Sequence, residues 1–245
     1  MQSEYHRWFS PRLRRDFELK VYGWQGKPLL VFPSSKGRFY QYEDFGMVEA
    51  CRPFLDEGRV KLFAVDGVDA ESWWNDHAHP AEKARRHQEY DAYIIQEAVP
   101  FIHEHCRVGP IPIMTTGCSF GAYHAANFLL RHPEVFDTAI CLSGVYSVRE
   151  FVGDYLDENV IVNDPVRFLD SMNDPWVTGR YRNARLILCA GQGAWEERFL
   201  AETRRLSHAL QRKGIDHWCD IWGHDVDHDW PWWRKQIHYF LGQLV

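Results

Sequence analysis

The chain has 245 residues, and 45% of them are apolar, so it can bury a full hydrophobic core without disulfides or a partner. Its formal net charge is −6, and the short basic cluster Arg12, Arg14 and Arg15 is too small to follow a phosphate backbone, so a nucleic-acid ligand is not expected. No stretch approaches the roughly 18–20 apolar residues that cross a bilayer, and the first residues lack the apolar core of a signal peptide. We therefore expect a cytoplasmic protein that does not bind membranes.

One domain over residues 1–245 is the expected organisation, because no linker, charge block or internal repeat marks a boundary. The six cysteines contain no C-x-x-C pair, and most lie in or beside apolar runs, which favours reduced thiols over a disulfide framework. They are Cys51, Cys106, Cys118, Cys141, Cys189 and Cys219.

Short runs rich in β-branched and aromatic residues alternate with longer runs of helical period, a pattern typical of an α/β fold with a mostly parallel sheet covered by helices on both faces. The predicted strands are residues 18–22, 29–32, 60–65, 111–116, 138–142, 185–190 and 218–222. Only residues 23–27 separate the first two, which therefore suggest an antiparallel hairpin at one edge of the sheet.

The predicted helices are residues 44–55, 81–105, 120–131, 197–213 and 232–244. The second has apolar or small residues at every fourth position, but Pro100 is expected to kink or end it. The fourth is expected to end at Gly214, a suitable C-terminal cap. Residues 145–181 fit neither period, and we expect them to form a cap-like insertion of short helices over the sheet edge.

A G-x-S-x-G motif, Gly117 to Gly121, lies between the strand at 111–116 and the helix at 120–131. A turn this sharp forces the central serine into a strained backbone conformation and exposes its hydroxyl at the end of the sheet. Ser119 is therefore the candidate nucleophile. The Phe120 amide, at the start of the following helix, is a candidate oxyanion donor.

A serine hydroxyl needs a base to remove its proton, and the base needs an acid to hold its tautomer. The loop after the last strand reads Trp222-Gly-His224-Asp-Val-Asp-His228-Asp and contains two candidate bases. Their position before the terminal helix suits either histidine.

Three stretches resemble the putative-esterase family of α/β-hydrolases: G-C-S-F-G-A-Y-H-A-A-N-F (117–128), D-G-V-D-A-E-S-W (66–73) and H-D-W-P-W-W (228–233). That family includes S-formylglutathione hydrolase, enterochelin esterase and the secreted mycolyltransferases, and the resemblance covers residues 17–244. It implies the α/β-hydrolase fold, no cofactor and an ester substrate. It also implies that His228, in H-D-W, is the catalytic histidine.

The acid is one of two adjacent glutamates, because this chain has no aspartate where family members usually carry one. Spacing from the helix that contains Leu206 and Ser207, together with the resemblance to the mycolyltransferases, favours Glu197. Glu196 is the alternative acid.

The second oxyanion donor is expected from the loop after residues 29–32, at the amide of Ser34 or Ser35. Trp73 and Trp74 are the tryptophans expected to line a substrate pocket, since large rings bind apolar groups well.

A metal site is the less favoured interpretation of the histidine-rich segments. His224 to Asp229 and the pair His77 and His79 contain ligand types, but no H-E-x-x-H motif occurs. His103 and His105 are expected to be surface features rather than ligands.

The sequence thus predicts a serine carboxylesterase that acts on a small-molecule ester through an acyl-enzyme. A thioesterase or acyltransferase would use the same residues, and a non-catalytic binding protein on this fold is an alternative from another class. The sequence leaves open whether the chain forms a homodimer.

Overall fold

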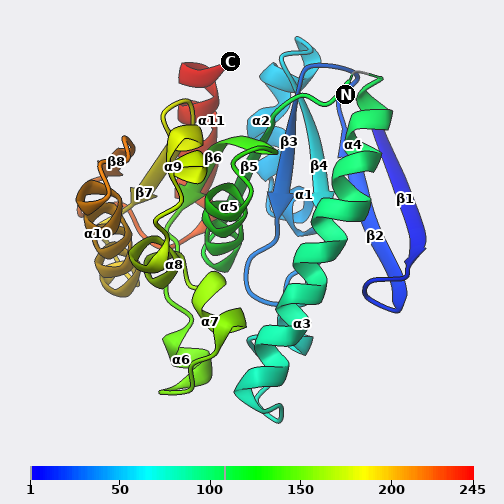
Figure 1. Ribbon diagram of the computed structural model, residues 1–245. Helices are drawn as coiled ribbons and strands as arrows, with labels where there is room; N and C mark the ends of the chain where they lie inside the picture. The colour runs from blue at the N-terminus through cyan, green and yellow to red at the C-terminus, as the bar shows by residue number, and fades with distance from the viewer. Residues whose placement is uncertain (1, 108) are drawn as a thin grey trace.

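Eight strands form one sheet in the order β1-β2-β4-β3-β5-β6-β7-β8 (Figure 1). The computed structural model describes residues 2–107 and 109–245. The strands are β1 (Ser3–Ser10), β2 (Arg15–Tyr22), β3 (Lys27–Phe32), β4 (Val60–Val65), β5 (Ile113–Cys118), β6 (Phe136–Leu142), β7 (Arg185–Ala190) and β8 (Trp218–Ile221). From β4 to β8 all neighbours are parallel, so the predicted mostly parallel sheet is confirmed.

The central strands are buried on both faces, which explains their nearly continuous apolar sequences. Every residue of β4 and β5 is buried. Because β3, β5 and β6 run in the same direction, the loops that follow them meet at one edge of the sheet. Ligand sites of open α/β sheets lie at this edge.

The expected hairpin between the first two predicted strands is wrong. β2 pairs with β1 and with β4, both antiparallel, and β4 lies between β2 and β3. The strand β1 was not predicted from the sequence. Its residues alternate between exposed and half-buried, so it lacks the apolar run of the inner strands.

Helices cover both faces of the sheet (Figure 1). One apolar core lies between the sheet and α2 with α11, and a second lies under α3, α4, α5, α8 and α10. The helices are α1 (Gln41–Asp44), α2 (Met47–Asp56), η1 (Asp69–Glu71), α3 (Pro80–Tyr93), η2 (Ile94–Ala98), α4 (Val99–Cys106), α5 (Phe120–Arg131), α6 (Arg149–Val152), α7 (Glu158–Val162), α8 (Pro165–Ser171), α9 (Pro175–Tyr181), α10 (Glu197–Arg212) and α11 (Trp230–Leu244).

The long helix predicted at 81–105 is divided by a π-helical turn. The turn, η2, joins α3 to α4, and Pro100 occupies the first turn of α4. Proline has no N–H to donate to the preceding turn, and the wider π turn accommodates that loss. At the end of α10, Gly214 adopts φ 65°, which confirms the expected cap.

Residues 145–181 contain the short helices α6 to α9, in the region where irregular structure was expected. Val148, Val152 and Val160 from this segment pack with Phe120 and Tyr123 of α5 in a small third core. The segment therefore lies against the helix that follows Ser119.

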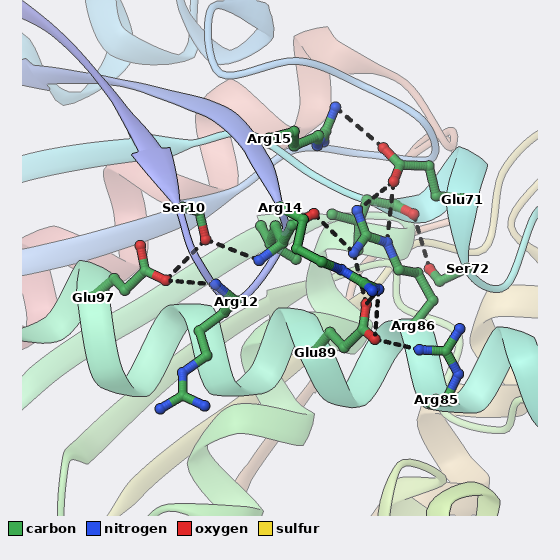
Figure 2. Close-up of polar contacts among 12 residues, drawn as sticks. Ser10, Arg12, Arg14, Arg15, Glu71, Ser72, Arg85, Arg86, Glu89 and Glu97 are labelled. Carbon is green, nitrogen blue, oxygen red and sulfur yellow. Dashed lines mark hydrogen bonds and ion pairs between the residues drawn. The ribbon is translucent and has the colours of Figure 1, made fainter.

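The turn between β1 and β2 is attached to η1, α3 and η2 by polar contacts (Figure 2). Glu97 accepts hydrogen bonds from Ser10 Oγ at 2.8 Å and from the Arg12 amide at 3.3 Å. Arg14 pairs with Glu89 at 3.2 Å, and Arg15 pairs with Glu71 at 3.1 Å. Part of the basic cluster seen in the sequence is thus engaged in ion pairs that fix the turn.

Across the described residues, no helix combines the length and the apolar character that crossing a membrane requires. All six cysteines are free thiols, as expected from their spacing.

Candidate active site

Ser119 stands at the turn between β5 and α5, with φ 54° and ψ −120°. An L-residue rarely adopts a positive φ, and such strain is concentrated at functional positions. The turn leaves the Ser119 side chain half-buried while both neighbours, Cys118 and Phe120, are buried. The serine is therefore the accessible residue of the motif.

The two glycines of the motif are required by close approach of the backbone. A Cβ at Gly117 would lie 2.2 Å from the Gly121 carbonyl carbon, and a Cβ at Gly121 would lie 2.6 Å from Phe32 O and 2.7 Å from Pro33 O. Real Cβ atoms do not approach backbone so closely. The glycines allow α5 to pack directly on the end of β3 and the loop that follows it.

His228 lies in the loop between β8 and α11, and its Nε2 is 3.1 Å from Ser119 Oγ. The two residues are 109 positions apart in the sequence. The ring stacks on Phe199, with centroids 3.7 Å apart, and contacts the edge of Trp233. Of the two histidines in the loop, His224 is exposed, whereas His228 faces the serine.

The loop that carries His228 is bound to the loop that follows β7. The His228 amide donates to Ala194 O at 3.0 Å, and the Gly193 amide donates to Val226 O at 2.8 Å. A Cβ at Gly191 would lie 2.0 Å from Val226 O, so only glycine permits this contact. The two loops are therefore held in register, which fixes the position of the imidazole.

Glu196 is the carboxylate that lies beside His228. Its side chain is 0% exposed, and its Oε2 is 3.8 Å from His228 Nδ1. Both of these atoms are buried and have no hydrogen-bond partner among the described residues, and the separation is longer than a hydrogen bond. Glu197, favoured by the spacing in the sequence, is exposed at the first residue of α10. The structure thus places the alternative glutamate, not the favoured one, next to the histidine.

A buried serine holds the other oxygen of this carboxylate. Ser143, directly after β6, donates its hydroxyl to Glu196 Oε1 and accepts the indole N–H of Trp233 at 3.1 Å. An indole N–H can only donate, so the Ser143 proton must point toward Glu196. Ser143 adopts φ 51°, a conformation that is rare for a residue other than glycine. Sequence reasoning missed this residue, although its place directly after a buried strand at the active edge was a usable signal.

The matching family model, described as "Putative esterase", covers residues 40–244. The chain belongs to this esterase family. The protein is a serine ester hydrolase, which agrees with the strained backbone of Ser119 and with the position of His228 opposite it. No curated protein matches this esterase at a significant level.

Solved structures share the fold of this esterase at low identity. A ferulic acid esterase superposes with a TM-score of 0.75 at 17% identity, over 97% of this chain and 95% of that chain. The fluorophosphonate-binding serine hydrolase F of Staphylococcus aureus gives 0.73 at 17% identity, over 99% and 97% of the two chains. S-formylglutathione hydrolase of Staphylococcus aureus gives 0.72 at 17% identity, over 99% and 96%. The chain has the α/β-hydrolase fold, as the sequence resemblance implied.

Two backbone amides of this esterase, one at the start of α5 and one in the loop after β3, donate no hydrogen bond to another described residue. The Phe120 amide belongs to the first residue of α5, where helical N–H groups have no partner within the helix. In the loop after β3, the Ser34 amide donates to Gln41 Oε1 at 2.8 Å and the Lys36 amide donates to Asp69 Oδ2 at 3.2 Å. Within the described part of the chain, no hydrogen bond takes the Ser35 amide. Of the two expected serines, Ser35 is therefore the available donor.

A buried aspartate fixes the loop that contains Ser35. Asp69 is 1% exposed, and its Oδ1 is hydrogen-bonded to His124 Nε2 on α5 at 2.9 Å. Its Oδ2 accepts the Lys36 amide. Asp69 thus connects the loop after β3 to the helix that follows Ser119.

The two tryptophans expected in the pocket have different positions. Trp73 is 0% exposed and packs against His87 in the core, so it does not line an open surface in this structure. Trp74 is half-buried and contacts the rings of Phe120 and Phe151, and Lys36 Nζ lies 5.1 Å from its ring centroid. Trp74 therefore borders the site between the nucleophile turn and the 145–181 segment.

The histidine pair considered as metal ligands in the sequence occupies the loop before α3. His79 Nδ1 accepts the Ala81 amide at 3.2 Å and caps that helix, whereas His77 is exposed. In the other histidine-rich segment, His228 faces Ser119.

Proposed function

We propose that this esterase is a serine carboxylesterase with Ser119 as nucleophile, His228 as general base and Glu196 as the acid that orients the base. The observation that supports it most directly is the 3.1 Å separation between His228 Nε2 and Ser119 Oγ. This distance is within the range required for proton transfer between a base and its nucleophile.

In the acylation step, Ser119 Oγ attacks the ester carbonyl carbon while its proton moves to His228 Nε2. The negative charge that develops on the carbonyl oxygen is stabilised by the amides of Phe120 and Ser35. The carbon–oxygen bond to the leaving alcohol then breaks, and the imidazolium returns the proton to that alcohol. An acyl-Ser119 intermediate remains.

In the deacylation step, water replaces the alcohol. His228 accepts a proton from the water as the hydroxide oxygen attacks the acyl carbon, and Ser119 Oγ then leaves and takes the proton back. The products are a carboxylic acid and the free enzyme. The same intermediate could be taken by an alcohol, in which case the enzyme would act as an acyltransferase.

Glu196 and Ser143 prepare the histidine for these steps. Ser143 occupies one oxygen of the carboxylate, which leaves Oε2 for His228 Nδ1. The gap of 3.8 Å would shorten to a hydrogen bond when the imidazole becomes charged, as catalytic contacts commonly do in the reacting complex. The carboxylate would then stabilise the imidazolium and fix its tautomer.

The rings around the serine favour a small-molecule ester with an apolar or aromatic acyl group. Phe199 covers one face of His228, and Trp74 packs on Phe120 beside the nucleophile. Rings of this kind bind apolar and aromatic groups well. A structural neighbour is a ferulic acid esterase, which is consistent with such a substrate.

The test is labelling with a fluorophosphonate probe, followed by mass-spectrometric location of the adduct. We expect one adduct on Ser119, and we expect none in Ser119→Ala. With p-nitrophenyl esters of graded chain length, Ser119→Ala and His228→Gln should lose at least about 10³-fold in kcat. His224→Gln, which removes the exposed histidine of the same loop, should retain activity.

Full activity in a folded Ser119→Ala protein would refute the proposal. Absence of labelling and of hydrolysis in the native protein would instead favour a non-catalytic binding role. Faster turnover of thioesters, or acyl transfer to an added alcohol, would assign the same residues to a thioesterase or an acyltransferase.

A further inference from the structure

Three metal-ligating side chains converge between the edge strand β1 and the helix α4, which are neighbours in Figure 1. Glu4 and His6 are two residues apart on β1 and so project from the same face of the strand. His105 lies in the last turn of α4. One ligand atom from each of the three lies within 4.8 Å of the other two.

The spacing of these atoms suits a tetrahedral ion. Glu4 Oε2 is 3.1 Å from His105 Nε2 and 3.4 Å from His6 Nε2. Bonds of about 2.0 Å to a tetrahedral zinc ion place neighbouring ligand atoms about 3.3 Å apart. Two of the three separations are close to this value, and the third is no more than 4.8 Å.

One imidazole of the cluster has a ring nitrogen free for a ligand. His6 Nε2 is buried, and it has no hydrogen-bond partner among the described residues, so it is left to bind an ion. The neighbouring cation, Lys61, directs its Nζ to the carbonyl oxygens of Trp24 and His105.

We propose that Glu4, His6 and His105 form a zinc-binding site. Two imidazole nitrogens and one carboxylate oxygen are a donor set that Zn²⁺ accepts, with water in the fourth position. The side chains are 39%, 28% and 14% exposed, and a cavity of about 410 Å³ beside Glu4 and His105 gives the ion a path from solvent. The sequence interpretation had treated His105 as a surface feature.

The bound ion would attach the edge strand to the helix. Within the described sheet, β1 pairs only with β2, and its Trp8 and Ser10 side chains donate hydrogen bonds to Glu97 of η2. A bond through the metal to α4 would add to these contacts. Lys61, near His105, is the second residue of β4, so the site lies at the N-terminal end of the parallel strands. Ser119 follows the C-terminal end of β5, and the zinc site is therefore separate from the esterase site.

The experiment uses the full-length protein without an affinity tag, after removal of metal with a chelator. Titration with CoCl₂ should give one equivalent of tetrahedral Co²⁺, read from the intensity of its visible absorption, and ZnSO₄ should displace it. Zn²⁺ should also raise the melting temperature of the protein. His6→Gln and His105→Gln should each lower the affinity at least 10-fold and remove the zinc-dependent shift in melting temperature.

The matched control is His103→Gln, on the same helix, because His103 Nε2 is hydrogen-bonded to Ile111 O rather than to the cluster. It should bind the metal as the native protein does. Esterase activity should be unchanged in all three variants, which shows that they are folded.

Failure of the native protein to bind one equivalent of Co²⁺ would overturn the proposal. So would undiminished binding in His6→Gln or His105→Gln. A near-ultraviolet charge-transfer band that disappears in Cys106→Ser would also overturn it, because thiolate rather than Glu4 would then be the ligand.

Discussion

Trp233 donates its indole N–H to Ser143 Oγ at 3.1 Å, and this contact determines which way the serine hydroxyl points. The proton of Ser143 is thereby directed to Glu196, the carboxylate beside His228. A residue of the terminal helix is thus linked, through one hydroxyl, to the carboxylate of the candidate active site. A series of neighbouring side chains therefore links α11, the ends of β6 and β5, and the loops after β7 and β8. In order, these side chains are Trp233, Ser143, Glu196, His228 and Ser119.

Removal of the Ser143 hydroxyl should impair catalysis by releasing one oxygen of Glu196. We expect Ser143→Ala to lower kcat about 10-fold. We also expect it to destabilise the fold by about 1–3 kcal/mol, because the Trp233 N–H and Glu196 Oε1 are left buried without partners. Ester hydrolysis and urea unfolding measure the two effects.

The variant Ser143→Gly distinguishes the effect of losing the hydroxyl from the effect of the strained backbone conformation. Both variants lack the hydroxyl, but glycine also relieves the positive φ of 51°. The loss in kcat should be the same in both, while the glycine variant should be the more stable by about 1 kcal/mol. A glycine variant with native kcat would show that the hydroxyl has no role.

The two adjacent glutamates should differ sharply in their effect on activity. Glu196→Gln should lower kcat by about 10²–10⁴-fold, because an amide cannot stabilise the imidazolium and can favour the wrong tautomer. Glu197→Gln should change kcat less than about 2-fold, since Glu197 is exposed. Steady-state kinetics on both proteins makes the comparison, and the reverse pattern would assign the acid to Glu197.

The turn around Ser119 could be predicted because it has a local signal, whereas the choice of His228 over His224 came from the family resemblance. Gly117 and Gly121 mark the turn around Ser119, and the inner strands have continuous apolar runs. The choice between Glu196 and Glu197 has no such signal. It depends on the turn before α10, where Trp195 adopts φ 67° and the next residue, Glu196, is buried. Adjacent residues point in different directions, so one of the two carboxylates is buried while its neighbour is exposed.

The order of the edge strands also could not be predicted from local sequence. A short connection between β2 and β3 suggested a hairpin, but β4 enters between them and pairs with both. That pairing is decided by the covering of both faces of β4 by helices. The order of these strands therefore depends on tertiary packing, which cannot be predicted from residues that are neighbours in the sequence.

Substitution of Gly121 should test how closely α5 packs on β3. Gly121→Ala should destabilise the protein by about 1–3 kcal/mol, because the new Cβ would meet the Phe32 and Pro33 carbonyl oxygens, and backbone cannot easily shift. Activity should fall as well, since the displaced backbone leads into the loop of Ser35.

Gly179→Ala is the matched control for this substitution. Gly179 lies in α9, and a Cβ there meets nothing within 4 Å. This variant should be about 0.5–1 kcal/mol more stable than the native protein, because alanine favours the helix. Thermal and urea unfolding give both values, and equal effects of the two substitutions would contradict the packing argument.

The buried histidine His87 should make the fold sensitive to acid. Its Nε2 lies 3.3 Å from the hydroxyl oxygen of Tyr123, which donates its own proton to Asn163 O at 2.8 Å, and its Nδ1 has no partner. Burial, with the positive charges of His124 and Arg131, lowers the pKa of His87 well below its ordinary value of 6.5. Protonation would place an unpaired N–H and a charge in the core.

A lowered pKa means that, below about pH 6.5, the unfolded chain binds a proton that the folded chain does not. The contribution of His87 to stability is therefore complete above this pH and is lost as the pH falls, by up to about 1.4 kcal/mol per pH unit for one proton. His87→Gln should reduce the loss of unfolding free energy between pH 6.5 and 5, measured by urea unfolding. His238→Gln, at an exposed position on α11, should leave the native pH dependence unchanged. Equal slopes in the native and His87→Gln proteins would show that His87 binds protons alike in the folded and unfolded chains, so that its pKa is not lowered by burial.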